Sequence, residues 1–189
     1  MKACSLIAVL FVATLALGQG NPQLSQRGQN DNATYNNIVR EVRHEIRMQP
    51  YYSIFDDISF KVNGTSVQLL GQVVNPTLKS DVENAVKKIE GVTSVDDQIE
   101  VLPPSPMDDR IRLATARTLA NTPQLSKYFW SALPSIHIIV KSGHVRLTGV
   151  VDNDADKNIA GMKANGMPGT LGQVQNDLRV VGRRTESDE

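Results

Sequence analysis

Apolar and polar residues alternate, with the period of a β-strand, in two stretches of the chain that closely resemble each other. The stretch SVQLLGQVVN begins at Ser66, and HVRLTGVVDN begins at His144. Each has valine or leucine at alternate positions and a glycine, Gly71 or Gly149, at the same place. Because alternate side chains of a strand lie on one face, each stretch predicts a strand with one covered face. The chain is therefore expected to contain a structural repeat.

The residues around the first stretch predict a helix, two strands, a second helix and a third strand. Ile38, Val42 and Ile46 recur at helical spacing, and Pro50 ends that helix. An Asn-Gly pair at 63–64 predicts a hairpin between the first two strands, because both residues tolerate positive φ. The expected strands are 58–62, 67–73 and 95–101, and the second helix is expected over 78–89.

The second copy follows the same order. Its helices are expected over 108–122 and 152–162, and its strands over 136–140, 145–151 and 174–180. Because two helices can cover one face of a three-stranded sheet, the predicted fold class is α+β. It consists of two tandem αββαβ layer sandwiches, each a three-stranded sheet with two helices on one face. At Gly71 and Gly149 we expect the close approach of another backbone, from a helix that crosses the sheet.

The chain is expected to divide into six segments. These are a signal peptide (1–20), a flexible leader (21–34), a first domain (35–102), a proline-rich linker (103–107), a second domain (108–182) and a polar tail (183–189). An apolar run from Leu6 to Leu17, followed by small residues, predicts the signal peptide and export. Cys4, the only cysteine, precedes that run, so no lipid-anchoring cysteine is expected. The leader is polar and buries too little apolar surface to offset the entropy of ordering.

The charged residues are balanced overall but unevenly placed. The formal net charge of the chain is zero, which argues against a dedicated nucleic-acid binder. Residues 34–102 contain seven Lys and Arg against ten Asp and Glu, whereas 108–184 contain eleven against six. The basic second half is open to three interpretations: packing against the acidic first half, a solvated surface, or attraction to an anionic membrane.

Three alternating aspartates have part of the spacing of a metal site. Asp152, Asp154 and Asp156 have the spacing of the first ligands of an EF-hand calcium loop. Lys157 and Lys163 stand where that loop needs glycine and glutamate, so the calcium motif fails at two positions. The carboxylates are instead expected to cap the helix that follows and to favour its positive end.

No other arrangement of residues predicts a metal, a cofactor or a catalytic centre. The three histidines, His44, His137 and His144, share no ligand spacing and are expected at the surface. The sequence contains no nucleophile elbow and no phosphate-binding loop. We therefore predict a protein that is not an enzyme.

A short aromatic cluster follows the first helix of the second copy. It contains Lys127-Tyr128-Phe129-Trp130, with the sole tryptophan of the chain. Aromatic rings beside a cation suit the interface between a membrane and water. The alternative is that these rings cover the end of the sheet or the partner domain. Packing is slightly favoured, because most large aromatic residues are buried and Tyr51-Tyr52-x-x-Phe55 lies in the analogous place.

The stretch VQLLGQVVNPTLKSDVENAVKKIEGVTSVDD of the first copy has a V-x-L-x-G-x-V strand, then a helix rich in Ala and Val, and a last part that Gly91 opens. It resembles the BON domain, a bacterial module. The family pattern ends in G-V-x-x-V-x-[ND]-x-[IL]-x-V, and the first copy fits the pattern throughout. The second copy matches at its strand around Gly149 and departs at Thr170, after Gly169. The glycines of the pattern, Gly71, Gly91, Gly149 and Gly169, are expected to have structural roles.

The resemblance implies a periplasmic protein for envelope maintenance, often linked to osmotic or other stress, and association with phospholipid. On this basis, we predict an exported, non-enzymatic binding protein whose second domain associates reversibly with anionic phospholipid. The residues expected to contact lipid are Arg117, Lys127, Tyr128, Phe129 and Trp130. The alternative is a protein-interaction or chaperone-like module that binds envelope proteins without lipid.

Overall fold

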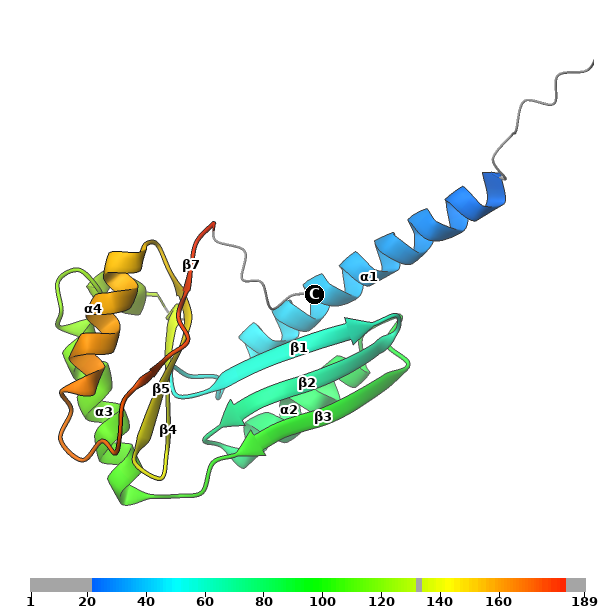
Figure 1. Cartoon of the computed structure of the whole chain (residues 1–189). Helices are drawn as coiled ribbons and strands as arrows, with labels where there is room; N and C mark the ends of the chain where they lie inside the picture. Colours follow the sequence, from blue (N-terminus) through cyan, green and yellow to red (C-terminus); the bar gives the residue numbers. More distant parts are fainter. Residues whose placement is uncertain (1–21, 132–133, 183–189) are drawn as a thin grey trace, which may run out of the picture.

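Two sheet-and-helix units lie side by side in the structure (Figure 1). The computed structural model describes residues 22–131 and 134–182, so the predicted signal peptide and polar tail lie outside the described residues. Domain 1 consists of α1 (Pro22–Met48), β1 (Asp57–Asn63), β2 (Ser66–Val73), α2 (Pro76–Lys87) and β3 (Ser94–Val101). Domain 2 consists of α3 (Pro106–Ala120), the 3-10 helix η1 (Ser126–Phe129), β4 (Ile136–Lys141), β5 (His144–Val151), α4 (Asp154–Asn165), β6 (Gln175–Asn176) and β7 (Arg179–Val180). The predicted α+β class and the repeat are confirmed.

The two sheets have the same topology. In domain 1 the strand order is β1-β2-β3, with β1 antiparallel and β3 parallel to β2. In domain 2, β4 is antiparallel to β5, while β6 and β7 are both parallel to β5. These two short strands replace the single strand predicted over 174–180. The ladder stops beside Asn176, whose side chain donates to the Lys157 carbonyl of α4 at 2.8 Å and accepts from the Leu178 N–H at 3.4 Å.

The helices of each domain cover one face of its sheet and bury an apolar core against it. The core of domain 1 comprises Ile38, Val42, Ile46, Val67, Leu69, Val73, Leu78, Val82, Val86 and Ile99. The core of domain 2 comprises Ile111, Leu119, Leu125, Tyr128, Ile136, Ile138, Val140, Val145, Leu147, Val151, Ala160, Ala164 and Leu178. The periodic positions read from the sequence are therefore mostly core positions.

Side-chain caps begin three of the helices. Asn75 accepts from the Thr77 N–H at α2, Ser105 from the Asp108 N–H at α3, and Asn153 from the Asp156 N–H at α4. The cap of α4 is therefore Asn153, and not the aspartates predicted for that role; Asp154 and Asp156 lie in its first turn. Helix α3 begins at Pro106, inside the predicted linker, because Ser105 caps it and proline is well suited to a first helical turn.

Helix α1 begins earlier than expected. The segment predicted as a flexible leader over 21–34 is, from Pro22 onward, the first part of this 27-residue helix. Between Pro22 and Pro50 the sequence has no proline, so nothing breaks the helix before its apolar turns begin at Ile38. Figure 1 shows that this first part extends beyond the sheet of domain 1.

Gly71 and Gly149 occupy equivalent places in the two sheets. A Cβ on Gly71 would lie 2.0 Å from the Asp57 carbonyl oxygen, and one on Gly149 would lie 2.0 Å from that of Ser135. Their φ angles are +129° and +111°, which side chains rarely adopt. The predicted close approach of a backbone is confirmed, but the predicted helix is wrong. The backbone belongs to the start of the neighbouring strand, because Ile58 pairs with Gly71 and Ile136 with Gly149.

The segment between α1 and β1 joins domain 1 to domain 2. Ile54 and Phe55 pack against the core of domain 2, and the Ile54 carbonyl accepts from the Ile138 N–H at 2.7 Å. That N–H lies on the side of β4 away from β5, so the segment covers the edge of the second sheet. Domain 1 therefore pairs with a backbone group of β4 that an edge strand would otherwise leave unpaired.

Two ion pairs connect the acidic domain to the basic one. Arg146 of β5 contacts Asp57 of β1 at 2.7 Å, and Lys141 at the end of β4 contacts Glu100 of β3. The bond from Lys141 holds the pKa of the exposed Glu100 carboxyl below its usual range. Part of the basic charge of domain 2 is thus used in packing on domain 1, one of the three interpretations open from the sequence.

Candidate functional site

Lys127 and Tyr128, two of the residues predicted to contact lipid, bind within domain 2. The Tyr128 hydroxyl donates to Asp156 at 2.6 Å and accepts from the Asp152 N–H at 2.8 Å, and the ring is only 6% exposed. The Lys127 ammonium lies 2.6 Å from Asp152 and 3.1 Å from Asp156. Its hydrogen bond to Asp152 raises its pKa, and that of Tyr128 lowers the pKa of Asp156. These hydrogen bonds and ion pairs hold η1 against the start of α4.

The remaining predicted lipid contacts lie differently. Phe129 is partly buried against the core of domain 2. Trp130, in contrast, is 81% exposed, and Arg117 in the last turn of α3 is exposed as well. The packing interpretation therefore holds for Tyr128 and Phe129, whereas Trp130 is available for contact with another molecule.

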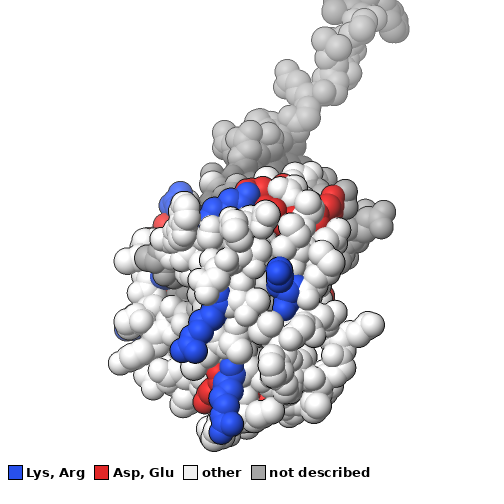
Figure 2. All heavy atoms as spheres, turned by 90° about the vertical axis from the view of Figure 1, so that its left-hand side faces the viewer, with Lys and Arg blue, Asp and Glu red and all other residues white. Residues whose placement is uncertain are grey.

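A face of domain 2 formed by α3 and α4 carries cations without acidic partners. Figure 2 shows separate Lys and Arg side chains on a largely uncharged surface, viewed from the left-hand side of Figure 1. The exposed cations of the two helices include Arg110, Arg117 and Lys163. Within the described part of the chain, none of these three forms an ion pair, whereas Lys127, Lys141 and Arg146 all do. We call this surface the α3–α4 face.

The α3–α4 face also exposes large apolar side chains. Met107 is 48% exposed, Leu113 46% and Met162 68%. The inward side of α4 carries the buried Ala160 and Ala164, whereas Met162 lies at the surface. Exposed apolar residues among cations are typical of surfaces that bind membranes or other proteins.

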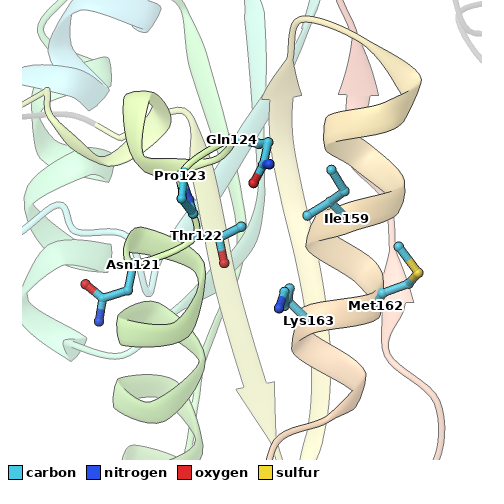
Figure 3. Close-up of a pocket in the computed structure, with 7 residues that line it drawn as sticks. All are labelled: Asn121, Thr122, Pro123, Gln124, Ile159, Met162 and Lys163. Carbon is cyan, nitrogen blue, oxygen red and sulfur yellow. The ribbon is translucent and has the colours of Figure 1, made fainter.

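Two shallow hollows lie between the elements of this face. The larger, of about 400 Å³, lies between the end of α3 and α4, where Pro123, Ile159, Met162 and Lys163 contribute to its lining (Figure 3). The smaller, of about 310 Å³, lies at the start of α3 and includes Met107 and Arg110. Each hollow therefore combines an exposed methionine with a cation.

The other two glycines of the repeated pattern lie in turns, not in strands. Gly91 and Gly169 have φ angles of +89° and +87°. Gly91 lies against Ile38 of α1, and Gly169 lies against Met107 of α3. They follow the second helix of their domains and contact the first, which is a structural role.

The sequence interpretation missed Leu113, Met107 and Met162 as surface residues. One signal for Leu113 was present, because it lies outside the apolar stripe of Ile111, Thr115 and Leu119 on the same helix. The methionines carried no such signal, since a methionine at helical spacing is equally compatible with a core position.

Metal ligands do not gather in the described residues. No group of three or more His, Cys, Asp or Glu side chains there is placed to hold a metal ion. Likewise, no helix among residues 22–131 and 134–182 is long and apolar enough to span a membrane.

The chain belongs to the BON domain family, whose model matches residues 35–103 and again 108–182. BON domains are binding modules without catalytic activity, and membership supports an envelope-associated role. No curated protein matches the sequence significantly.

Two similar solved structures are of CdsD, a structural protein of the type III secretion system of Chlamydia trachomatis. The first, its C-terminal domain, is 18% identical, with 77% of this chain and 98% of that chain covered and a TM-score of 0.28. The second is 16% identical, with 75% and 91% covered and a TM-score of 0.27. Similarity at this level carries no argument about function.

Proposed function

We propose that this protein acts in maintenance of the bacterial cell envelope by docking reversibly on anionic phospholipid through domain 2. The observation that carries the proposal is the combination, on the α3–α4 face, of three cations without ion pairs and three exposed apolar side chains. The periplasm is the proposed location, where osmotic or other stress is the proposed occasion for this role.

The energetics favour weak, reversible docking. Each basic residue near an anionic lipid surface contributes about 1 kcal/mol, so Arg110, Arg117 and Lys163 together contribute roughly 3 kcal/mol. Exposed methionine and leucine side chains that reach the boundary between headgroups and acyl chains add to this. Trp130 suits the same depth, because its ring is apolar and its N–H can remain in contact with water.

The proposal changes the set of residues expected to contact lipid. Arg117 and Trp130 remain, while Lys127 and Tyr128 are omitted because Asp152 and Asp156 already bind them. Phe129 is omitted because it packs on the core. Arg110 and Lys163 are added.

A second candidate function is protein binding by the same face. The two hollows with methionine at their rims favour it, since flexible methionines adapt to different apolar partners. An amphipathic helix with acidic residues along its apolar side would complement both hollows and cations.

Vesicle flotation distinguishes the two candidates. We expect the protein to float with phosphatidylglycerol vesicles at low salt, to be released by high salt, and not to float with phosphatidylcholine vesicles. Arg117→Ala and Lys163→Ala should each weaken binding about fivefold, which corresponds to about 1 kcal/mol. Arg179→Ala is the matched control, because Arg179 is exposed in domain 2 but lies on β7.

Fluorescence of the sole tryptophan gives a second measurement on the same vesicles. We expect the emission of Trp130 to shift to the blue on binding and to be quenched by lipids with brominated acyl chains. The absence of flotation with anionic vesicles at both salt concentrations would remove the lipid proposal and leave protein binding.

A further inference from the structure

His137 lies in the contact between the two domains, although it was predicted at the surface. It projects from β4 on the side of the sheet opposite α3 and α4, because its neighbours Ile136 and Ile138 belong to the core. Its ring lies 5.5 Å from that of Tyr52 in domain 1. The surface prediction for His137 is wrong because the second sheet is covered on both faces, and the period of a strand does not reveal what covers its outer face.

Other side chains confirm that the outer face of this sheet is covered. Ile139, on the same face as His137, is only 2% exposed, and Thr148, which pairs with His137 across the strands, is 7% exposed. Arg146 on this face contacts Asp57, as described above. The hydrogen bond from the Ile138 N–H to the Ile54 carbonyl runs beside the histidine.

The surroundings of His137 suit a neutral imidazole. Its Nδ1 atom is buried and has no hydrogen-bond partner among the described residues. A protonated ring carries a donor on both nitrogens and a positive charge, and the burial of Nδ1 makes that charge costly.

Several charged and titratable groups face the ring, and their effects oppose one another. From the segment 52–57, Asp57, Asp56 and the backbone of Ser53 and Asp56 favour the charged ring. Tyr52 is itself neutral, because burial raises its pKa to about 12. Arg146 of β5, on the same face of the sheet, contacts Asp57 at 2.7 Å and lies 3.9 Å from Asp177, between β6 and β7. Burial outweighs the carboxylates and lowers the pKa of His137 below its ordinary value.

We propose that His137 makes the contact between the domains sensitive to acid, so that its protonation separates domain 1 from domain 2 while each domain stays folded. The closed contact favours the neutral ring. Its stability is therefore complete above the ordinary histidine pKa of about 6.5 and is lost as the pH falls below that value. Separation would uncover the outer face of the second sheet, including Ile139, as a new surface.

The distance between spin labels on the two domains tests this proposal. The labels would be attached to Asn84→Cys on α2 and Asn158→Cys on α4, both exposed positions, in the full chain with Cys4→Ser. We expect one narrow distance distribution at pH 7.5 and a broad one, extending to longer distances, at pH 5.0. The midpoint should lie below pH 6.5.

Two variants distinguish the effect of the His137 imidazole from the effects of other groups that titrate. His137→Phe keeps an aromatic ring and removes the titration, so its distribution should stay narrow at both pH values. His144→Phe removes an exposed histidine of the same sheet and should behave as the unaltered chain does. A distribution that does not change with pH in the unaltered chain, or one that broadens equally in His137→Phe, would overturn the proposal.

Amide hydrogen exchange provides a readout that does not depend on these variants. The Ile138 N–H should lose protection at pH 5.0, relative to the intrinsic exchange rate, because its acceptor is Ile54 of the other domain. Amides between β1 and β2 should stay protected, since their partners lie within domain 1. Loss of protection throughout both sheets would show unfolding instead of separation and would contradict the proposal.

Discussion

The two domains share a fold but expose different surfaces. The outer face of the first sheet is polar, and hydrogen bonds link its strands: Gln68 donates to Asp96 at 3.0 Å and Gln72 to Glu100 at 2.7 Å. The outer face of the second sheet is covered by domain 1, and domain 2 exposes Met107, Leu113 and Met162 on its helices instead. The two copies thus share their core positions, whereas their exposed surfaces differ. The domain family alone therefore does not locate the binding surface.

The two sheets also differ in what closes their edges. On β3 of domain 1, the N–H of Ile99 donates to the Asp97 side chain at 2.9 Å, and its carbonyl accepts from Lys79 at 2.6 Å. The centre of this edge is therefore closed by the domain's own side chains. On β4 of domain 2, the edge is closed by Ile54 of the other domain. One edge of the first sheet is thus closed by the domain's own side chains, whereas one edge of the second is closed by the neighbouring domain.

The largest loss of stability is expected at the two glycines that occupy equivalent places in the two domains. Gly71→Ala and Gly149→Ala each place a Cβ 2.0 Å from a carbonyl oxygen of the adjacent strand, at a φ that alanine rarely adopts. Backbone cannot yield as a side-chain tip does, so each change should lower the free energy of unfolding by about 4 kcal/mol or more. Urea denaturation followed by circular dichroism measures this loss.

Gly64→Ala is the control for the backbone angle. Gly64 has φ +63°, but no atom lies within 4 Å of the added Cβ. Its cost should be only about 1 kcal/mol, from the left-handed conformation. If Gly71→Ala or Gly149→Ala costs no more than Gly64→Ala, the close approach of the neighbouring strand is not what requires glycine there.

A smaller change, an increase in the free energy of unfolding, is expected at a position where the two cores differ. Thr115 of α3 is fully buried, and its hydroxyl has no partner among the described residues. The corresponding residue of α1 is Val42, which is also fully buried. Replacing the unpaired hydroxyl by a methyl group, in Thr115→Val, should raise the free energy of unfolding by about 1 kcal/mol.

The reverse change in domain 1 is the matched control. Val42→Thr should lower the free energy of unfolding by about 1 to 2 kcal/mol, because it buries a hydroxyl in an apolar core. Urea denaturation of both variants gives the comparison. Destabilisation by Thr115→Val would mean that the threonine hydroxyl makes a bond that stabilises domain 2.

Periodicity in the sequence was sufficient to predict the fold. Val67, Leu69 and Val73 and their counterparts in domain 2 are all buried, because burial of one face is what produces a period of two. The interruption between β6 and β7 was not predictable, since the side chain of Asn176, where β6 ends, bonds to the Lys157 carbonyl of α4. Such a contact between distant segments leaves no periodic trace.

The candidate site was predicted only in part. Arg117 and Trp130 are exposed as a binding role requires, but Lys127 has acidic partners that lie 25 or more residues away in the chain. The contact between domains left one trace: Ile139 and Val150 are apolar on the outer face, where domain 1 has Lys61 and Gln72. An apolar outer face indicates that something covers it, although not what does.

The smallest effect on stability is expected at Trp130. The segments between the first helix and the first strand differ in the two domains: Phe55 packs on the neighbouring domain, whereas Trp130 is 81% exposed. Trp130→Ala should change the free energy of unfolding by less than about 0.5 kcal/mol, as surface substitutions usually do. Phe55→Ala should cost roughly 2 kcal/mol, because it removes a partly buried ring.

Urea denaturation of these two variants, followed by circular dichroism, measures the contrast between the segments. A loss of more than about 1 kcal/mol in Trp130→Ala would show that the ring packs on domain 2. The same variant would then be unsuitable for testing membrane contact, because weaker vesicle binding would follow from loss of the fold. A change within the expected range leaves the fold intact, and any loss of vesicle binding then belongs to the indole ring itself.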